Sequence, residues 1–220
     1  MSAAPPTSEV AVCNLALGRI GQAAISSIES PESTEEDKVA QQYPATRRAL
    51  LRGYTFNFSK KLAQWTASGS ETPAYGFSNA FALPNDFIRL LTLGDYTIGA
   101  NTPPGLFEVV EGFIYTDQLD DADDETINVK YIKDVTTISK WDPLALKLLW
   151  LQLAWDLAPT FQVNQKKLAA LGLDDELKDI KLQAAAISGQ EHPPQRVQRS
   201  KVLSRRRRHG FSRDTTRYSV

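Results

Sequence analysis

Residues 141–159 read "WDPLALKLLWLQLAWDLAP" and contain the best candidate in the chain for a membrane-crossing run. The run falls short of the roughly 18 apolar residues that a bilayer requires. It is also interrupted by three polar residues, Lys147, Gln152 and Asp156. Asp142 followed by Pro143 predicts the start of an ordinary helix, because both residue types are favoured at a helix N-terminus. A helix over 143–161 is apolar on nearly all sides, so we expect it to be buried in a core or between subunits.

Apolar residues at steps of three and four predict three further helices, which cover 8–21, 34–53 and 165–188. Ser8 is a candidate N-cap for the first of these helices, and Gly21 is a candidate stop signal. The second opens with "STEE" (33–36), the pattern of a capping box. In such a box Ser33 accepts a hydrogen bond from the amide of Glu36, while the Glu36 carboxylate reaches back.

The middle of the chain alternates short apolar runs with Gly, Pro, Asn and Asp, which indicates strands and turns. "FEVVEGFIYT" (107–116) contains two extended runs around a Glu-Gly hairpin turn, and "TINVKYI" (126–132) has the alternation of a half-buried strand. We expect about four strands, mainly antiparallel, between residues 75 and 132. The predicted fold class is therefore mainly α, a helical bundle with an inserted small antiparallel β region (about 75–132) and an extended C-terminal arm.

The charge of the chain is asymmetric, although its formal total is only −1. Residues 1–7 are expected to be disordered, 8–192 to form the main domain and 193–220 to form a basic arm. The arm carries eight Arg and one Lys against one Asp, a net charge of +8, so residues 1–192 carry −9. An acidic body argues against a DNA-gripping surface there, because phosphate binding requires cations.

Residues suited to catalysis do not form a recognisable set, so we expect no enzyme, no cofactor and no metal. Both histidines, His192 and His209, lie in or beside the arm. Cys13 lies on an apolar helical face and is interpreted as a core thiol. The acidic run "DQLDDADDET" (117–126) is interpreted as a solvated hairpin loop, with a calcium site as the alternative, because it lacks the spacing of an EF-hand.

Six short motifs follow one another between residues 9 and 190. They are "VCNLALGRIGQAAISSI", the Tyr-x3-Arg-x2-Leu-Leu pattern of "YPATRRALLRG", "YTFNFSKKLAQ", "FALPNDFIRL", "INVKYI" and "WDPLALKLLWLQLAWDLAP". In this order they resemble the tail tubular protein A family, the head-to-tail adaptors of short-tailed phages and related prophage elements. Most of the motif residues also have a structural reading: Leu17, Ile20, Leu50, Leu51, Phe56 and Phe58 are predicted to be core, and Pro84-Asn85-Asp86 to form a turn.

The resemblance implies a structural function. Such adaptors assemble as a ring, commonly a dodecamer, below the portal protein of a filled capsid. The ring extends the DNA channel and is the platform for the next tail component, such as a nozzle of the tail tubular protein B type. Genomic DNA passes through without specific binding, and no membrane is involved. The chain is then made in the host cytoplasm and resides in the neck or tail of the virion.

Two groups of residues are predicted to make contacts in such an assembly. In related adaptors the C-terminal segment docks on the portal, which implies a portal-docking role for Arg205, Arg206, Arg207, Arg208, Phe211, Arg213, Arg217 and Tyr218. Arginines there can form bidentate contacts with carboxylates. On the apolar helix, the residues expected to pack on neighbouring helices, within or between subunits, are Leu148, Trp150, Leu151 and Trp155.

Two rival function classes remain open from the sequence. The first is a non-sequence-specific nucleic-acid-binding protein, because the arginines of "SRRRRHGFSR" (204–213) can neutralise phosphates. The second is a virion hydrolase, since carboxylates are numerous enough for a glycosidase. A solvated basic tail with no fixed partner is the alternative to a docking arm.

Overall fold

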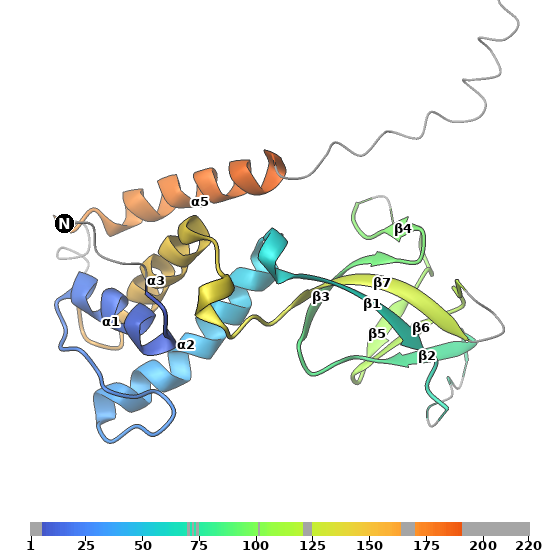
Figure 1. Cartoon of the computed structure of the whole chain (residues 1–220), viewed down its shortest axis with the longest axis horizontal. Coiled ribbons are helices and arrows are strands. Elements are labelled where there is room, and N and C mark those ends of the chain that lie inside the picture. The colour runs from blue at the N-terminus through green and yellow to red at the C-terminus, as the bar shows by residue number, and fades with distance from the viewer. Residues whose placement is uncertain are drawn as a thin grey trace, which may run out of the picture.

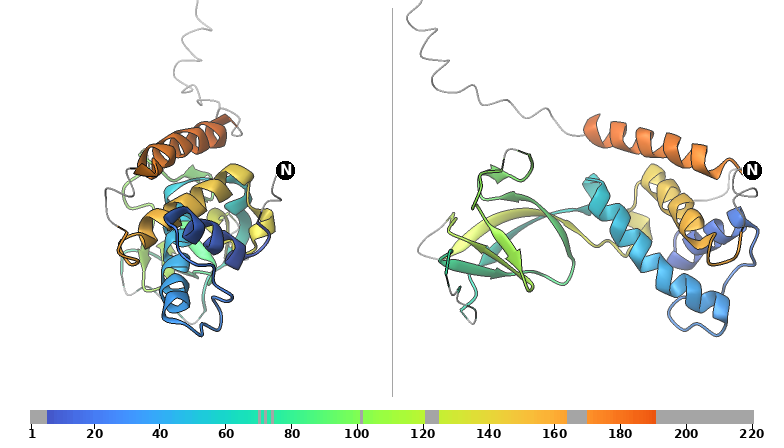
Figure 2. Two further views of the ribbon diagram at one scale, coloured as in Figure 1. Left: turned by 90° about the vertical axis from the view of Figure 1, so that its left-hand side faces the viewer. Right: turned by 180° about the vertical axis from the view of Figure 1, so that it is seen from behind.

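The structure is a computed structural model that describes residues 6–69, 71, 73, 75–100, 102–120, 125–163 and 170–190. Figure 1 shows two parts arranged along the longest axis of the molecule, a helical body and a β region. The chain enters the β region after its second helix and returns to the helical body before its third. The β region is therefore an insertion in the helical body, and the views in Figure 2 show that it lies at one end of that body.

The described helices of the body are α1 (Glu9–Ile20), α2 (Thr34–Gly53), α3 (Pro143–Leu157) and α5 (Leu173–Gln190). The predicted N-caps are confirmed: the Ser8 hydroxyl accepts from the amide of Ala11, Ser33 from that of Glu36, and the Asp142 carboxylate from Leu144 and Ala145. Gly21 ends α1 in the left-handed conformation with φ of 74°. That conformation favours glycine, so the predicted stop signal is also confirmed.

Helix α3 is the centre of the helical body, and α1, α2 and α5 all pack against it. Its buried residues are Ala145, Leu146, Leu148, Leu149, Leu151, Leu153, Ala154 and Leu157. Each fully buried leucine contributes about 1.5–3 kcal/mol relative to an exposed one. The predicted burial of this helix is confirmed, and the structure places most of it in the core of a single subunit.

The β region contains seven described strands in two antiparallel sheets. The four-stranded sheet has the order β1 (Lys60–Thr66), β7 (Thr126–Lys133), β3 (Phe87–Leu93) and β4 (Tyr96–Thr97). The three-stranded sheet has the order β2 (Asn79–Ala82), β6 (Phe113–Thr116) and β5 (Glu108–Val110). Short 3-10 helices, η1 (Asn57–Ser59) and η2 (Ile138–Lys140), lie at the two crossings between the helical body and the β region.

The two sheets share one apolar core, which is separate from that of the helical body. It contains Phe81 of β2, Ile114 of β6, and residues of β3 and β7. The predicted Glu-Gly hairpin is confirmed: Val110 pairs with Phe113, and both turn residues have positive φ, 47° and 86°. Two consecutive positive φ values define the type I′ turn, whose twist matches that of paired strands.

The predicted fold class is wrong, because the protein is a mixed α and β structure and not a mainly α bundle. The strands begin at Lys60, before the predicted boundary of 75, and they form two sheets and not one small region. Strand β1 escapes prediction because it lies at a sheet edge, where its sequence "KKLAQWT" (60–66) shows little apolar alternation. Strands β2 and β4 have only four and two residues, too few for periodicity to be visible.

Candidate functional site

The four residues predicted on the apolar helix have different surroundings. Leu148 and Leu151 are wholly buried in the core of the helical body. Trp150 is partly buried and packs against the same core. Trp155 is 37% exposed, so it is the one of the four that presents a large apolar surface to the outside.

The predicted arm lies outside the described residues. This applies to all eight of its candidate docking residues, Arg205, Arg206, Arg207, Arg208, Phe211, Arg213, Arg217 and Tyr218.

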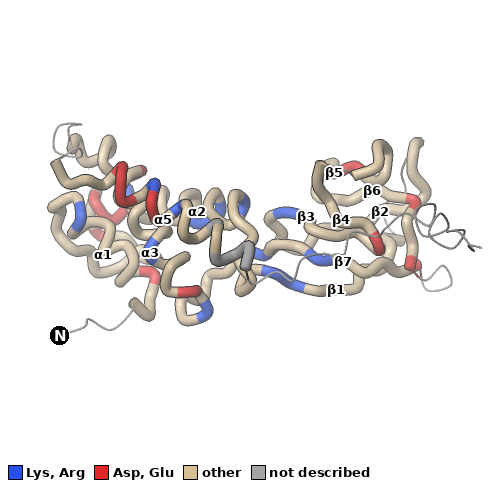
Figure 3. The backbone as a smooth tube through the Cα atoms, turned by 90° about the horizontal axis from the view of Figure 1, so that it is seen from above, with Lys and Arg blue, Asp and Glu red and all other residues tan. Residues whose placement is uncertain are grey.

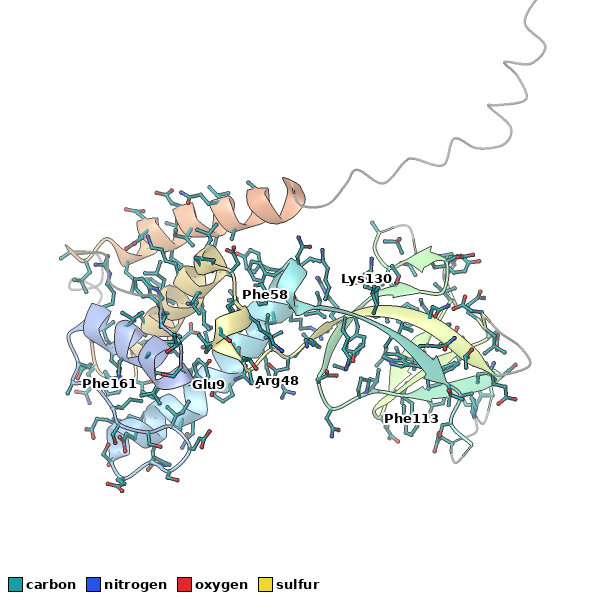
Figure 4. All side chains as sticks on the ribbon, in the orientation of Figure 1. Glu9, Arg48, Phe58, Phe113, Lys130 and Phe161 are labelled. Carbon is teal, nitrogen blue, oxygen red and sulfur yellow. The ribbon has the colours of Figure 1, made fainter. Side chains whose placement is uncertain are left out.

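A buried ion-pair cluster fixes the position of the β region relative to the helical body. The Arg47 guanidinium of α2 donates to both carboxylate oxygens of Asp134, at 2.9 and 3.1 Å, and to Glu9 Oε1 of α1 at 2.9 Å. Burial disfavours the charge of Arg47, but the hydrogen bonds to Asp134, the negative charge of Asp134 and the nearby Tyr43 together outweigh this and raise its pKa. Arg48 reaches the same Asp134 carboxylate at 3.0 Å from a more exposed position. Figure 4 places Arg48 at the side of the helical body nearest the β region.

The cluster continues into the β region through Asp86, just before β3. The amide of Asp134 donates to the Asp86 carbonyl at 2.7 Å. The Asp86 carboxylate accepts from Tyr131 Oη at 2.9 Å and from Lys61 Nζ at 3.1 Å. Partial burial disfavours the charge of Asp86, but the hydrogen bonds from Lys61 and Tyr131 outweigh it and lower its pKa.

We call this set of six residues the junction network: Glu9, Arg47, Asp134, Asp86, Lys61 and Tyr131. It links α1 and α2 to β1, β3 and β7 by consecutive polar contacts. The predicted turn at Pro84-Asn85-Asp86 is confirmed, since the amide of Phe87 bonds to the Pro84 carbonyl at 2.9 Å. Four of the network residues lie in the sequence motifs, namely Arg47, Asp86, Lys61 and Tyr131, whereas Glu9 and Asp134 lie outside them. The motifs do not show that these residues meet, because their partners are distant in sequence.

An aromatic stack covers a neighbouring part of the junction. Tyr54, Phe56 and Phe58 stack at successive centroid distances of 5.4 and 5.3 Å, and Phe58 lies 4.9 Å from Trp141. The Trp141 ring nitrogen donates to the Val135 carbonyl at 3.1 Å. The predicted core positions Leu17, Ile20, Leu50, Leu51 and Phe56 are confirmed as buried, whereas Phe58 is partly buried against that core.

Glu36 organises the loop that precedes α2. Its carboxylate accepts from the Glu32 amide at 2.7 Å, from the amide and hydroxyl of Ser26 at 2.8 Å each, and from the Ser27 amide at 3.3 Å. These bonds lower its pKa to about 2. The predicted capping box is therefore confirmed only in part. Ser33 caps the helix, but the Glu36 carboxylate binds the preceding loop and not the Ser33 amide.

Cys13 and the acidic loop do not form a described reactive centre. Cys13 is wholly buried, and burial together with the nearby Glu9 charge raises its pKa to about 12, which confirms the core thiol. In the acidic run, Asp117 accepts from the Ser78 amide and Asp120 from the Asn128 amide, while 121–124 lie outside the described residues. Within the described ranges, no group of three or more potential ligands could hold a metal ion.

An open pocket of about 430 Å³ lies where the start of α1 meets the loops before α2 and α3. Its lining is Ser8, Glu9, Val10, Ser27, Ile28, Glu29, Thr136 and Thr137. Glu9 is already held by Arg47, and the Ser8 hydroxyl caps α1. These two polar groups of the pocket therefore serve the local structure.

Comparison with models of known protein families and with curated proteins finds no match to this chain. Among the described helices, none is both long enough and apolar enough to cross a membrane. The functional interpretation therefore depends on the motifs and on the surfaces that the fold creates.

Proposed function

We propose that this chain is a structural head-to-tail adaptor of a short-tailed phage. It assembles as a ring under the portal, extends the DNA channel and provides the platform for the next tail component. It resides in the neck or tail of the virion after synthesis in the host cytoplasm. The ring has the twelve subunits common in the family that the motifs resemble.

One observation carries the proposal: residues from motifs that are far apart in sequence meet at the junction of the two parts of the fold. Arg47 and Asp86 belong to two different motifs and both contact Asp134 at the junction, and the aromatic run 54–58 of a third motif stacks on Trp141 where the chain crosses between the two parts. The order of motifs that resembles the adaptor family is therefore supported by residues that act together in space.

A junction of this kind suits a structural role. Polar groups buried with satisfied hydrogen bonds favour one arrangement of the elements that carry them. The ends of strands β3 and β7 also place Ile88 and Ile132 in the core of the helical body. A subunit held both by apolar packing and by the junction network keeps its two ends in a fixed relation, which a ring joining two other rings requires.

The arm is the proposed contact with the portal. Its 28 residues, 193–220, span at most about 90–100 Å when extended, at roughly 3.3–3.6 Å per residue. Arg205 to Arg208 supply guanidinium groups for bidentate contacts with portal carboxylates, and Phe211 and Tyr218 supply apolar anchors.

A pull-down with portal rings of the same phage, at moderate salt, tests the proposal. We expect the full chain to bind the rings. We expect a chain truncated after Gln195 to keep the circular dichroism and melting temperature of the full chain but to lose attachment. Failure of the full chain to bind overturns the adaptor function, and unchanged attachment of the truncated chain overturns the role of the arm.

A DNA gel shift separates the adaptor from the nucleic-acid-binding alternative. The truncated chain is expected to give no shift at about 50 mM salt. Phosphate binding requires a positively charged surface, and the body carries a net negative charge. The full chain binds portal rings with a weak dependence on salt if apolar anchors contribute. A clear DNA shift by the truncated chain favours the nucleic-acid-binding function instead.

A further inference from the structure

The described sheets have four edge strands, β1 and β4 in one and β2 and β5 in the other, and of these β1 and β5 combine exposed aliphatic side chains with opposite charge. Strand β1 is the first in the order of the four-stranded sheet, and β5 is the last in that of the three-stranded sheet. An edge strand presents main-chain amide and carbonyl groups in a row, which is a template for pairing with another chain. Both edges therefore have the backbone geometry for a contact with a second molecule.

Both edges also expose apolar side chains. Leu62 of β1 is 76% exposed, and it shares a face of the sheet with its partner Lys130. Val109 and Val110 of β5 are 47% and 39% exposed, although consecutive strand residues point to opposite faces. An edge strand with apolar side chains exposed on both faces is an aggregation hazard unless another surface covers it.

The two edges are complementary in charge. Strand β1 begins with Lys60 and Lys61, whereas β5 begins with Glu108 and is followed by Glu111. All Lys and Arg residues of the seven strands lie on the four-stranded sheet, namely Lys60, Lys61, Arg89, Lys130 and Lys133. Figure 3 shows these cations on the strands near the helical body and carboxylates at β5 and the far end of the β region. Opposite charges across paired strands stabilise the pairing, and like charges oppose it.

The two edges face opposite ways. In the view of Figure 3, β1 and β5 lie on opposite sides of the β region. A contact between two different patches on opposite sides repeats from subunit to subunit, and it gives a closed ring or an open filament.

We propose that the edge of β1 in one copy of this chain pairs with the edge of β5 in the next copy. Lys60 then faces Glu108, and Leu62 packs against Val110 on the same face of the extended sheet, while Lys61 keeps its bond to Asp86 of its own subunit. This contact is the subunit interface of the proposed ring, and the closure of the copies into a ring rests on the proposed adaptor function. The contact itself joins two copies of the chain and requires no other component.

Cysteine cross-linking tests the contact on the full chain. Leu62→Cys and Val110→Cys place thiols on the two edges, and Cys13 does not compete because it is wholly buried. Under mild oxidation, with and without portal rings, a mixture of the two variants is expected to give disulfide-linked dimers. The double variant is expected to give a ladder of linked oligomers, and each single variant alone only monomers. The proposal is overturned if the mixture gives no link, or if single variants link to themselves as efficiently.

Charge reversal supplies a second measurement. Lys60→Glu or Glu108→Lys, introduced into the cysteine variants, is expected to lower the cross-link yield up to about fivefold, and the two reversals together to restore it. Lys178→Glu on α5 is the matched control, because Lys178 is exposed and far from both edges in sequence. No effect of either reversal, or an equal effect of the control, contradicts the pairing. If the chain binds portal rings but gives no β1–β5 links, the proposed subunit contact is overturned and the adaptor function stands. If links form but the chain does not bind portal rings, the adaptor function is overturned and the subunit contact stands.

Discussion

The helical body and the β region differ in how completely they bury their apolar side chains. The body surrounds one nearly all-apolar helix, α3, with three others and leaves few large apolar residues exposed. The β region has a smaller core between two sheets and leaves Leu62, Val109 and Val110 exposed at its edges. The body therefore buries most of its large apolar side chains, whereas the β region leaves aliphatic side chains exposed at two of its sheet edges.

The largest expected effect comes from the centre of the helical body. Leu148→Ala removes a wholly buried side chain of α3, and we expect it to lower the free energy of unfolding by about 3–4 kcal/mol, because a cavity remains. Leu182→Ala on α5 is the matched control, since Leu182 is 72% exposed and is expected to change stability by less than about 0.5 kcal/mol. Denaturant unfolding measures both, and similar losses at the two positions contradict the central place of α3.

This contrast explains which parts of the fold the sequence predicts. Ser8, Ser33 and Asp142 act within a few residues of themselves, so the starts of three helices are predictable. Strand β1 is paired with β7, about 65 residues later, and as an edge strand it needs no apolar alternation. The starts of the helices are therefore predicted correctly, because capping is local. The fold class is predicted wrongly, because β1 depends on long-range pairing and is missed.

The second effect tests the junction between the two parts. Arg47→Met keeps the length of the side chain but leaves Glu9 and Asp134 without its guanidinium. We expect a loss of about 2–3 kcal/mol, less than for a fully buried pair because Arg48 still reaches Asp134. We also expect Arg47→Met to increase the rate of hydrogen exchange in β1, β3 and β7 more than in α3.

Arg48→Met is the matched control for this prediction, because it removes the other guanidinium from the same carboxylate. The Arg48 side chain is 54% exposed, so its loss is expected to cost less than about 1 kcal/mol. Equal losses in the two variants, or exchange that rises equally in all elements, contradict a junction held by Arg47.

The junction network contains residues that the sequence predicts and residues that only the fold brings together. Arg47 and Asp86 stand in recognisable motifs, but Asp134, which connects them, lies 87 residues from Arg47. Only the return of β7 to the helical body brings these residues together. Leu148 and Leu151 are predicted to pack on helices within or between subunits, and they lie in the core of one subunit. The sequence leaves both options open, because an all-apolar helix has the same pattern in either case.

A smaller, pH-dependent effect is expected from Glu36, in the first turn of α2, whose carboxylate binds the preceding loop. Its pKa is lowered from 4.5 to about 2 by bonds from Glu32, Ser26 and Ser27. Its contribution to stability is thus fully present above about pH 4.5 and is lost as the pH falls toward about 2. Glu36→Gln is expected to lower the melting temperature at pH 7, with a difference from wild type that shrinks below pH 4.5. A difference that is constant with pH contradicts the role of the charge.

The smallest effect on stability is expected at the exposed edge of the β region. Leu62→Thr is expected to change the free energy of unfolding by less than about 0.5 kcal/mol, because Leu62 has few neighbours to lose and threonine suits a strand. Val129→Thr, buried on the other face of the sheet, is the matched comparison and is expected to cost about 1–3 kcal/mol through its buried hydroxyl. If Leu62→Thr destabilises the single subunit as much as Val129→Thr, then Leu62 serves folding and loses its place in the subunit contact. If Leu62→Thr is neutral for the monomer yet weakens the self-association of the full chain, measured by sedimentation, the exposed apolar edge contributes to the subunit contact.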